Sequence, residues 1–224
     1  EAVVSVTQSG VITANSVGTA TITATKAADN LYSAASATVA ITVTPKIEQN
    51  IAFPSDTYSV IITNQITITP TGGEGDGAVS FSSSDDSIVT VSSDGVVTGI
   101  SLGTVTVTAT KAEDSTFAEA KAQTSVTVTP KLAQSITFGE QSYTVVLGNS
   151  QSVTASGGPG IGQISYVSSD SSIATVNSAG LVTGVAIGSV TITAFKAADS
   201  TYEEASATTT VNVSGLLQQT IGFS

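Results

Sequence analysis

The 224-residue sequence contains no cysteine, histidine, methionine or tryptophan, and its 6 basic residues are all lysine. Without cysteine, neither a disulfide nor a thiolate metal site can form. Without histidine, any catalysis would depend on carboxylates, hydroxyls or lysine. The formal net charge of −11 argues against binding to nucleic acid or to an anionic membrane surface, since both need clustered cations.

Long hydrophobic runs are missing as well. No stretch of about 18 apolar residues is present, so the sequence predicts no membrane insertion. Threonine, serine, valine, alanine and glycine dominate instead, and residues branched at Cβ favour strands. We therefore expect a folded all-β chain. The sequence starts at Glu1 in the middle of a pattern and shows no signal peptide, as expected for a fragment.

A group of one lysine, one aspartate and one aromatic residue occurs three times, at a constant step of 85 residues. The copies lie in TKAADNLYSAASA (25–37), TKAEDSTFAEAKA (110–122) and FKAADSTYEEASA (195–207). The matching residues are Lys26, Lys111 and Lys196; Asp29, Asp114 and Asp199; and Tyr32, Phe117 and Tyr202. A constant step indicates an array of like repeats, and 85 residues suit one small β-sandwich per repeat.

Pro45 and Pro130 mark the predicted boundaries, because each is followed by lysine and a short polar stretch. We name the segments the partial first repeat (1–45), the second repeat (46–130), the third repeat (131–214) and the start of a fourth (215–224). In the fourth segment, Ile221 and Phe223 match Ile136 and Phe138. The partial first repeat corresponds to the C-terminal part of a full repeat.

Short alternating runs in the third repeat predict strands. These are QSITF (134–138), YTVVL (143–147), SVTAS (152–156), QISYVS (163–168), IATV (173–176), LVTGV (181–185), SVTITAF (189–195) and TTTVNVS (208–214). In TVTVTAT (104–110), the alternation predicts valine and alanine facing the core and threonine facing solvent. Gly10, Gly95 and Gly180 are expected at hairpin turns with positive φ.

Two stretches resemble the bacterial immunoglobulin-like domain of group 2. They are SFSSSDDSIVTVSSDGVVTGISLGTVTVTAT (80–110) and SYVSSDSSIATVNSAGLVTGVAIGSVTITAF (165–195), with five motif elements at fixed spacing. The chain departs from the family in having Phe81 and Tyr166 where tryptophan is frequent. The resemblance implies tandem immunoglobulin-like β-sandwiches in a bacterial protein at the cell surface or outside the cell, such as an adhesin, and it supplies no catalytic residue.

Three functions remain open from the sequence. The leading one is a structural spacer or stalk module whose partners are neighbouring repeats of the same chain. The second is a module that binds a surface glycan or protein through two glycine-rich loops. The candidate residues there are Gly73, Glu74, Asp76, Gly158, Pro159 and Ile161. The third is self-assembly with other copies by strand addition, using Gln219–Phe223.

The repeated lysine, aspartate and aromatic residue have two interpretations. They form either a recurring ligand or crosslink site, or a structural loop before the last strand. A lysine–asparagine crosslink is disfavoured because no asparagine recurs across all repeats. In the structural interpretation, aspartate caps the turn, the aromatic ring closes the end of the sandwich, and EDSTFAEA (113–120) forms one helical turn.

Asp85, Asp86 and Asp170 are the candidates for a metal site, because carboxylates near the ends of such modules suit Ca²⁺. The alternative is an Asx turn that satisfies its own backbone. No other cofactor is expected. The glycine-rich loops lack the lysine and following helix of a phosphate-binding loop, and no carboxylate pair recurs as in a glycosidase, so we expect no enzyme activity.

Overall fold

A computed structural model describes residues 2–216 and residue 221 of the chain. These residues form strands, turns and loops with no helix, which confirms the all-β prediction. Accordingly, none of the described residues belongs to a helix long and apolar enough to cross a membrane. The expected strand at Gln219–Phe223 lies outside the described residues apart from Ile221.

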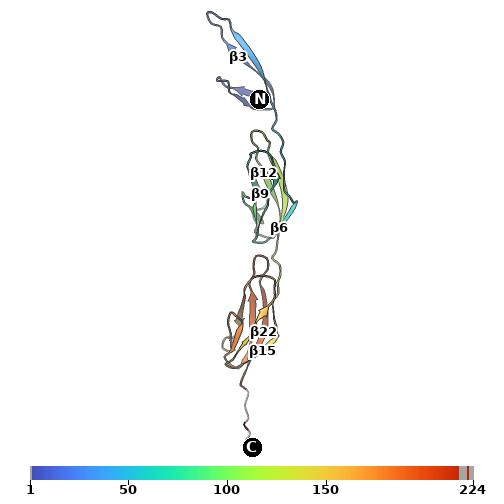
Figure 1. The fold of residues 1–224 in the computed structure, drawn as a ribbon, viewed down its shortest axis with the longest axis vertical. Helices are drawn as coiled ribbons and strands as arrows, with labels where there is room; N and C mark the ends of the chain where they lie inside the picture. Colours follow the sequence, from blue (N-terminus) through green and yellow to red (C-terminus); the bar gives the residue numbers. More distant parts are fainter. Residues whose placement is uncertain (1, 217–220, 222–224) are drawn as a thin grey trace. The chain divides into compact units, whose positions relative to one another are not determined.

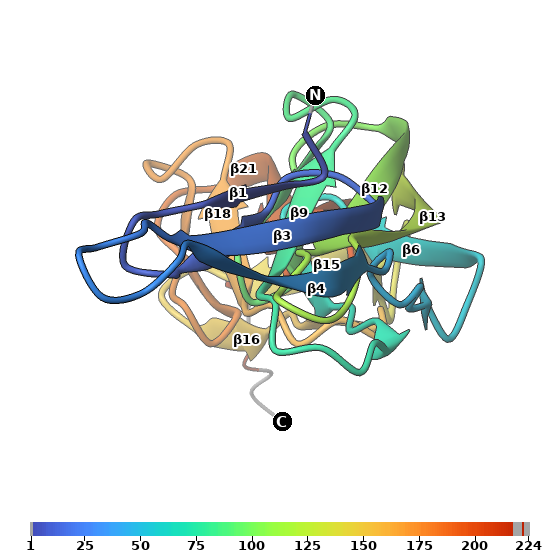
Figure 2. The same ribbon diagram turned by 90° about the horizontal axis from the view of Figure 1, so that it is seen from above.

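The partial first repeat contains two antiparallel hairpins (Figures 1 and 2). Their strands are β1 (Val4–Val6), β2 (Ile12–Ala14), β3 (Gly18–Lys26) and β4 (Ala35–Val43). β1 pairs with β2, and β3 pairs with β4 over nine residue pairs, from Gly18–Val43 to Lys26–Ala35. Gly10 has a φ of 85°, so the predicted positive-φ turn is confirmed at this position.

The second repeat contains nine strands. They are β5 (Ile51–Ala52), β6 (Thr57–Ile61), β7 (Gln65–Thr67), β8 (Thr71–Gly72), β9 (Val79–Ser83), β10 (Val89–Val91), β11 (Val96–Gly99), β12 (Gly103–Lys111) and β13 (Ala120–Thr129). One sheet has the order β6-β13-β12-β9, a second has the order β10-β11-β7, and β5 pairs with β8. β6 runs parallel to β13, and the other pairs with described registers are antiparallel.

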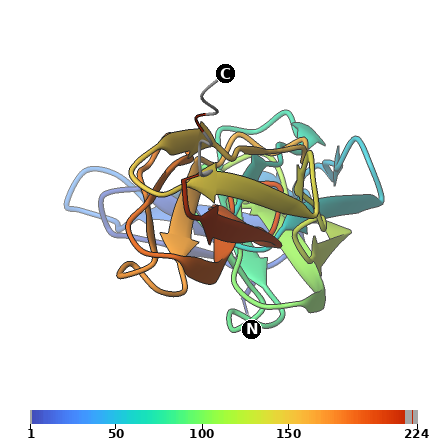
Figure 3. The same cartoon turned by 90° about the horizontal axis from the view of Figure 1, so that it is seen from below.

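The third repeat contains the same nine strands. They are β14 (Thr137–Phe138), β15 (Ser142–Val146), β16 (Ser150–Ser152), β17 (Ala155–Ser156), β18 (Ile164–Ser168), β19 (Ala174–Val176), β20 (Leu181–Gly184), β21 (Gly188–Lys196) and β22 (Ala205–Ser214). The sheets have the orders β15-β22-β21-β18 and β16-β20-β19, with β14 paired to β17. Figure 3 shows these yellow-to-red strands from below, relative to the view of Figure 1.

By compactness the chain divides into two units. The first comprises Glu1–Pro54, Thr69–Ser80 and Ala109–Gln123, and the second comprises Ser55–Ile68, Phe81–Thr108 and Thr124–Ser224. The boundaries of this division differ from the repeat boundaries that the sequence predicts at Pro45 and Pro130. Those repeat boundaries stay a prediction, and each contact described below lies within one of the two units.

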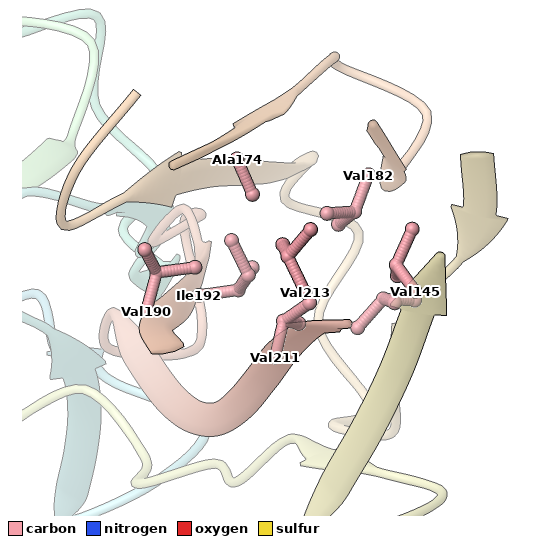
Figure 4. Close-up of a cluster of buried hydrophobic side chains, with 8 residues drawn as sticks. Val145, Ala174, Val182, Val190, Ile192, Val211 and Val213 are labelled. Carbon is pink, nitrogen blue, oxygen red and sulfur yellow. The ribbon is translucent and has the colours of Figure 1, made fainter. Parts of the chain in front are cut away.

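The core of the third repeat is built from both of its larger sheets. Ala174 and Val182 come from one sheet, and Ile192, Val211 and Val213 come from the other. Figure 4 shows these side chains pointing toward one another. Their burial follows from the period of two in each strand, which directs alternate side chains to the same face.

The second repeat buries residues at the same positions, 85 earlier. Val107 and Ala109 are 0% exposed, as are Ile192 and Ala194. The threonines that alternate with them, Thr104 and Thr106, are exposed. The predicted division of TVTVTAT (104–110) into an apolar inner face and a threonine outer face is therefore confirmed.

Two poles of the third repeat are defined by its longest strands. β21 ends and β22 begins at the Lys196–Ala205 pair, which we call the proximal pole. β22 ends at Ser214, beside the end of the parallel strand β15, and we call this end the distal pole. Since β22 is a continuous 10-residue strand, the two poles are separated by about 30 Å.

Three local predictions are wrong. The strand expected at 152–156 is interrupted at Val153 and Thr154, which separate β16 from β17. EDSTFAEA (113–120) forms bends and an isolated bridge rather than a helical turn, because Asp114 closes the turn through its own side chain. The strand expected at 134–138 covers Thr137–Phe138 alone. Its partner β17 is equally short, because Gly157 follows it at a φ of 112° and redirects the chain.

Candidate functional site

The lysine, aspartate and aromatic residue that recur in each repeat lie in one loop. We call it the Lys–Asp–aromatic loop (111–118 and 196–203). In the third repeat, Oδ1 of Asp199 accepts hydrogen bonds from the backbone N–H groups of Thr201 and Tyr202, both at 2.8 Å. In the second repeat, Oδ1 of Asp114 accepts the equivalent bonds at 2.7 and 2.8 Å. Aspartate therefore closes the turn, as the structural interpretation expects.

The second carboxylate oxygen of the same aspartate reaches the glycine-rich loop (72–77 and 157–162). Oδ2 of Asp199 accepts a 2.7 Å bond from the N–H of Ile161. Oδ2 of Asp114 accepts a 2.7 Å bond from the N–H of Asp76. One side chain thus joins two loops that are far apart in the sequence.

Lys196 also binds the glycine-rich loop. Its Nζ donates to the carbonyl oxygens of Gly157 at 3.1 Å and Gly158 at 3.0 Å, and the residue is 8% exposed. In the second repeat, the end of the Lys111 side chain lies beside Gly73. Both lysines are therefore directed toward the glycine-rich loop of their own repeat.

Gln49 and Gln134 complete this arrangement, and neither residue was among the predicted site residues. Nε2 of Gln134 donates to the carbonyl of Glu203 at 2.6 Å, and its Oε1 accepts from the N–H of Gly160 at 3.2 Å. Gln49 makes the same two contacts, with Ala118 and Gly75. Their 85-residue separation was the available signal, because a polar residue repeated beside the boundary indicates a recurrent contact.

The segment that leads into each repeat is bonded to the same loop. The N–H of Leu132 donates to the carbonyl of Thr201 at 2.8 Å, and the N–H of Glu203 donates to the carbonyl of Leu132 at 2.9 Å. Ile47 makes the same pair of bonds with Thr116 and Ala118, both at 2.9 Å. The proximal pole thus fixes the chain immediately after the predicted linker.

Glycine is required where the two loops approach each other. A Cβ at Gly162 would overlap the carbonyl oxygen of Ala197, and one at Gly77 would overlap that of Ala112. The glycines therefore allow a close backbone approach that any side chain would prevent.

Hydrogen bonding lowers the pKa of these aspartates below the usual range. For Asp199, the N–H groups of Tyr202, Thr201 and Ile161 stabilise the carboxylate, and Lys131 adds a smaller attraction. For Asp114, the N–H groups of Phe117 and Thr116 lower the pKa most. Both side chains are therefore ionised at neutral pH and act as acceptors, not as acid catalysts.

The partial first repeat keeps the local part of this arrangement. Oδ1 of Asp29 accepts from the N–H groups of Leu31 and Tyr32, both at 2.8 Å. Lys26 is exposed, and Tyr32 is 70% exposed. The expectation that the ring closes the end of a sandwich is therefore wrong for Tyr32 within residues 2–45, where the two hairpins form separate two-stranded sheets and no glycine-rich loop is present. Phe117 and Tyr202 are half-buried.

The candidate binding residues of the glycine-rich loops divide into exposed and supporting positions. Glu74, Asp76, Pro159 and Ile161 are exposed, and Ile161 is 90% exposed. Gly73 and Gly158 are half-buried at φ values of 80° and 68°. The loops therefore present acidic tips in one repeat and apolar tips in the other, and their role in binding stays a prediction.

The calcium candidates lie in Asx turns. Oδ1 of Asp85 accepts from the N–H and hydroxyl of Ser87 at 2.9 and 2.6 Å. Asp170 makes the same contacts with Ser172. Among the described residues, no three or more acidic side chains lie close enough together to hold a metal ion, and this also applies to Asp86. Calcium binding stays a prediction, which a melting temperature raised by Ca²⁺ and restored by EDTA would support.

The fold and the loops define a class: an all-β, immunoglobulin-like module repeated in tandem, with its repeated polar side chains bonded to the backbone of neighbouring loops. The family model described as bacterial Ig-like domain (group 2) matches residues 37–123 and 122–208. The chain belongs to this family, which confirms the resemblance drawn from the motifs.

One curated relative is Ice-binding protein 1 of Shewanella frigidimarina (strain NCIMB 400), which is 31% identical over 204 residues. The match covers 83% of this chain and 21% of the relative, so the chain spans about a fifth of that protein's length.

Solved structures that the chain partly resembles include the S-layer protein SbsC and mouse cadherin-23. SbsC has a TM-score of 0.44 and 19% identity, and the match covers 94% of this chain and 37% of SbsC. A three-repeat fragment of cadherin-23, EC22-24, has a TM-score of 0.32 and 15% identity, over 95% of this chain and 82% of the fragment. At these scores, neither likeness carries an argument about function.

Proposed function

We propose that the chain is a structural spacer of a repetitive bacterial protein located at the cell surface or outside the cell, with no chemistry of its own. Its partners in this role are the neighbouring repeats of the same chain. Membership in the bacterial Ig-like family supports the assignment of an extracellular repeat module. The spacer role is inferred from the two poles of the third repeat and from the short linker before it.

The observation that carries the proposal is the path of the chain through the third repeat. The chain is bonded at Leu132 to the proximal pole and leaves at Ser214, at the distal pole. Two residues, Pro130 and Lys131, separate Leu132 from the last residue of β13, Thr129. A repeat that is entered at one end and left at the other extends an array, and such a short linker restricts its motion.

The repeated polar residues support the same role. Lys196, Asp199 and Gln134 each bond to the backbone of the glycine-rich loop or the Lys–Asp–aromatic loop. Their hydrogen bonds are made to the backbone of the repeat itself. This use of polar side chains holds the loops of the proximal pole together, as expected for a structural module.

Small-angle X-ray scattering tests the spacer role. We expect the maximum dimension to grow by at least about 30 Å for each added 85-residue repeat, since each repeat contains a strand of about 10 residues. A matched series of chains with one repeat added or removed provides the comparison. A maximum dimension that stays constant along this series would contradict the proposal.

A second candidate function is binding through the glycine-rich loops, favoured by the 90% exposure of Ile161. An exposed aliphatic side chain on a rigid loop suits a surface glycan or a protein. A glycan array tests this candidate, with Ile161→Ser as the control variant. Binding that is equal for both variants would place the ligand elsewhere.

The name of the Shewanella relative raises ice as a ligand of that protein. Because the chain spans 21% of it, we propose that this chain contributes reach and not ice binding. Thermal hysteresis of the isolated chain should equal that of a buffer control.

Self-assembly by strand addition predicts concentration-dependent polymers in analytical ultracentrifugation, whereas a monomer at all concentrations would remove that alternative.

A further inference from the structure

The turn between β6 and β7 is bonded to the end of the second repeat. The N–H of Asn64 donates to the carbonyl of Ile61 at 2.9 Å, which closes the turn. The N–H of Ile62 donates at 2.9 Å to the carbonyl of Thr129, the residue before Pro130. The turn is therefore held directly beside the point where the chain leaves for the third repeat.

The Asn64 side chain forms a hydrogen bond with the third repeat. Its Nδ2 donates to the carbonyl oxygen of Ser200 at 2.9 Å. Ser200 belongs to the Lys–Asp–aromatic loop of the third repeat, and both residues lie in the same compact unit, the second. This hydrogen bond joins residues 136 positions apart in the sequence.

The acceptor side of this contact is held in place within its own repeat. Asp199 bonds to the N–H groups of Thr201 and Tyr202, and Leu132 bonds to the carbonyl of Thr201. The peptide of Ser200 therefore has a fixed orientation before Asn64 approaches. A fixed acceptor lowers the entropic cost of forming the contact.

The same turn recurs in the third repeat. Asn149 donates its N–H to Val146 at 2.9 Å, and Leu147 donates to Ser214 at 2.9 Å. The preceding residue has a φ of 68° at Thr63 and 80° at Gly148. The turn thus keeps its shape even where a β-branched residue must adopt a left-handed conformation, which such residues disfavour.

The Asn149 side chain makes no hydrogen bond within residues 2–216 and 221. It therefore carries the same donor as Asn64, in the same turn, at the distal pole of the third repeat. This amide, which has no hydrogen-bond partner among the described residues, matches what a following repeat would engage through its own Lys–Asp–aromatic loop.

We propose that the asparagine of this turn is a joint residue that binds the Lys–Asp–aromatic loop of the next repeat. Its partner is a following copy of the repeat, and its effect is to restrict bending at the two-residue linker. The inference rests on the proposed spacer function and deepens it, because it assigns the stiffness of the array to a named contact.

Distance measurements between two spin labels test the proposal on the full chain. The absence of cysteine allows unique labelling at Ser93→Cys and Ser178→Cys, which are exposed positions 85 residues apart. Asn64→Asp keeps the size and turn preference of the residue and replaces the amide donor by an acceptor that faces a carbonyl. Asn149→Asp makes the same change where no complete repeat follows.

We expect Asn64→Asp to broaden the distribution of label distances and to lower the ratio of docked to undocked joints by about fivefold, the effect of losing one hydrogen bond. Asn149→Asp should leave the distribution unchanged. Hydrogen exchange at β6 and β7 should be equal in both variants and the parent, which shows that the turn still forms.

An unchanged distribution in Asn64→Asp, or equal broadening by Asn149→Asp, would overturn the joint role. Scattering separates this failure from that of the spacer function. If the maximum dimension still grows with each repeat, the spacer function stands and the asparagine contact alone is rejected.

Discussion

The β3–β4 hairpin of the partial first repeat and the β21–β22 hairpin of the third repeat have the same register. Each has nine cross-strand pairs, from Lys26–Ala35 and Lys196–Ala205 at one end to a glycine–valine pair at the other. Their burial differs sharply: Ala24 is exposed, whereas the equivalent Ala194 is 0% exposed. The comparison shows that alternation and turns determine the hairpin, while burial requires the strands of the other half of the repeat.

The Lys–Asp–aromatic loop shows the same division. Asp29 keeps both turn bonds that Asp199 makes through Oδ1. Lys26 is exposed, whereas Lys196 is 8% exposed and bonds to two carbonyls. Contacts within three or four residues survive without the rest of the sandwich, and contacts to distant loops do not.

The largest expected effect comes from adding a side chain where the glycine-rich loop and the Lys–Asp–aromatic loop approach each other. Gly162→Ala should lower the free energy of unfolding of the third repeat by about 3 kcal/mol, since the new Cβ would overlap the carbonyl of Ala197. Hydrogen exchange read peptide by peptide measures this loss separately for each repeat. Gly139→Ala is the control, because its Cβ would meet nothing closer than 3.6 Å. Equal losses in both variants would show that the loops can move apart.

A smaller effect is expected from the lysine pair. Lys196→Met should cost about 2 kcal/mol, because it removes two hydrogen bonds from a charged donor at a buried position. Lys26→Met should change the exchange of β3 and β4 by less than about 0.5 kcal/mol, as for other exposed substitutions. If the two substitutions have equal effects, the difference in burial between the repeats has no energetic consequence.

Tyr202 and Tyr32 provide another comparison between the third repeat and the partial first repeat. Tyr202→Ala should cost about 1.5 kcal/mol, since the residue is half-buried and loses part of its apolar contact. A fully buried ring would cost about 3–5 kcal/mol. Tyr32→Ala should be close to neutral at 70% exposure. Thermal unfolding of the full chain, with exchange to assign the repeat, distinguishes these values.

The smallest expected effect is a dependence on acid. The pKa of Asp199 is lowered in the folded state, chiefly by the N–H of Tyr202, so its contribution to stability is present above the usual aspartate pKa of about 3.9. It is lost as the pH falls below that value, when the folded repeat must take up the proton. Asp199→Asn should flatten the acid side of the melting-temperature profile for the third repeat.

Asp29→Asn provides the matched control for this profile. Its pKa is lowered by two turn bonds alone, and a change there should leave the third repeat unaffected. A profile for Asp199→Asn that follows the parent chain down to pH 2 would contradict the assigned role of the carboxylate.

Much of the fold was predictable because its signals are short-range. The expected strand at 181–185 is β20, Leu181–Gly184, and Gly95 and Gly180 both adopt the predicted positive φ of 77°. β22 begins at Ala205, three residues before the expected start, because pairing with β21 extends the strand to Lys196. The local alternation of apolar and polar residues does not indicate how far pairing with a neighbouring strand extends a strand.

The site was less predictable than the strands. The lysine, aspartate and aromatic residue stood out because they recur together in one motif, whereas Gln49 and Gln134 share the 85-residue step as single residues outside that motif. The helical turn expected at 113–120 failed since an Asx turn at Asp114 satisfies the backbone instead. Composition and spacing cannot reveal that choice.

By itself, the sequence determined the strands, the hairpin turns and the aspartate-closed loop, because these depend on alternation, glycine and hydrogen bonds between near neighbours. Only the tertiary structure decided that Lys196 is buried, that Asp199 reaches Ile161, and that Asn64 bonds to Ser200. Those contacts join segments 38 to 136 residues apart, and they form once the folded chain has brought these loops and turns together.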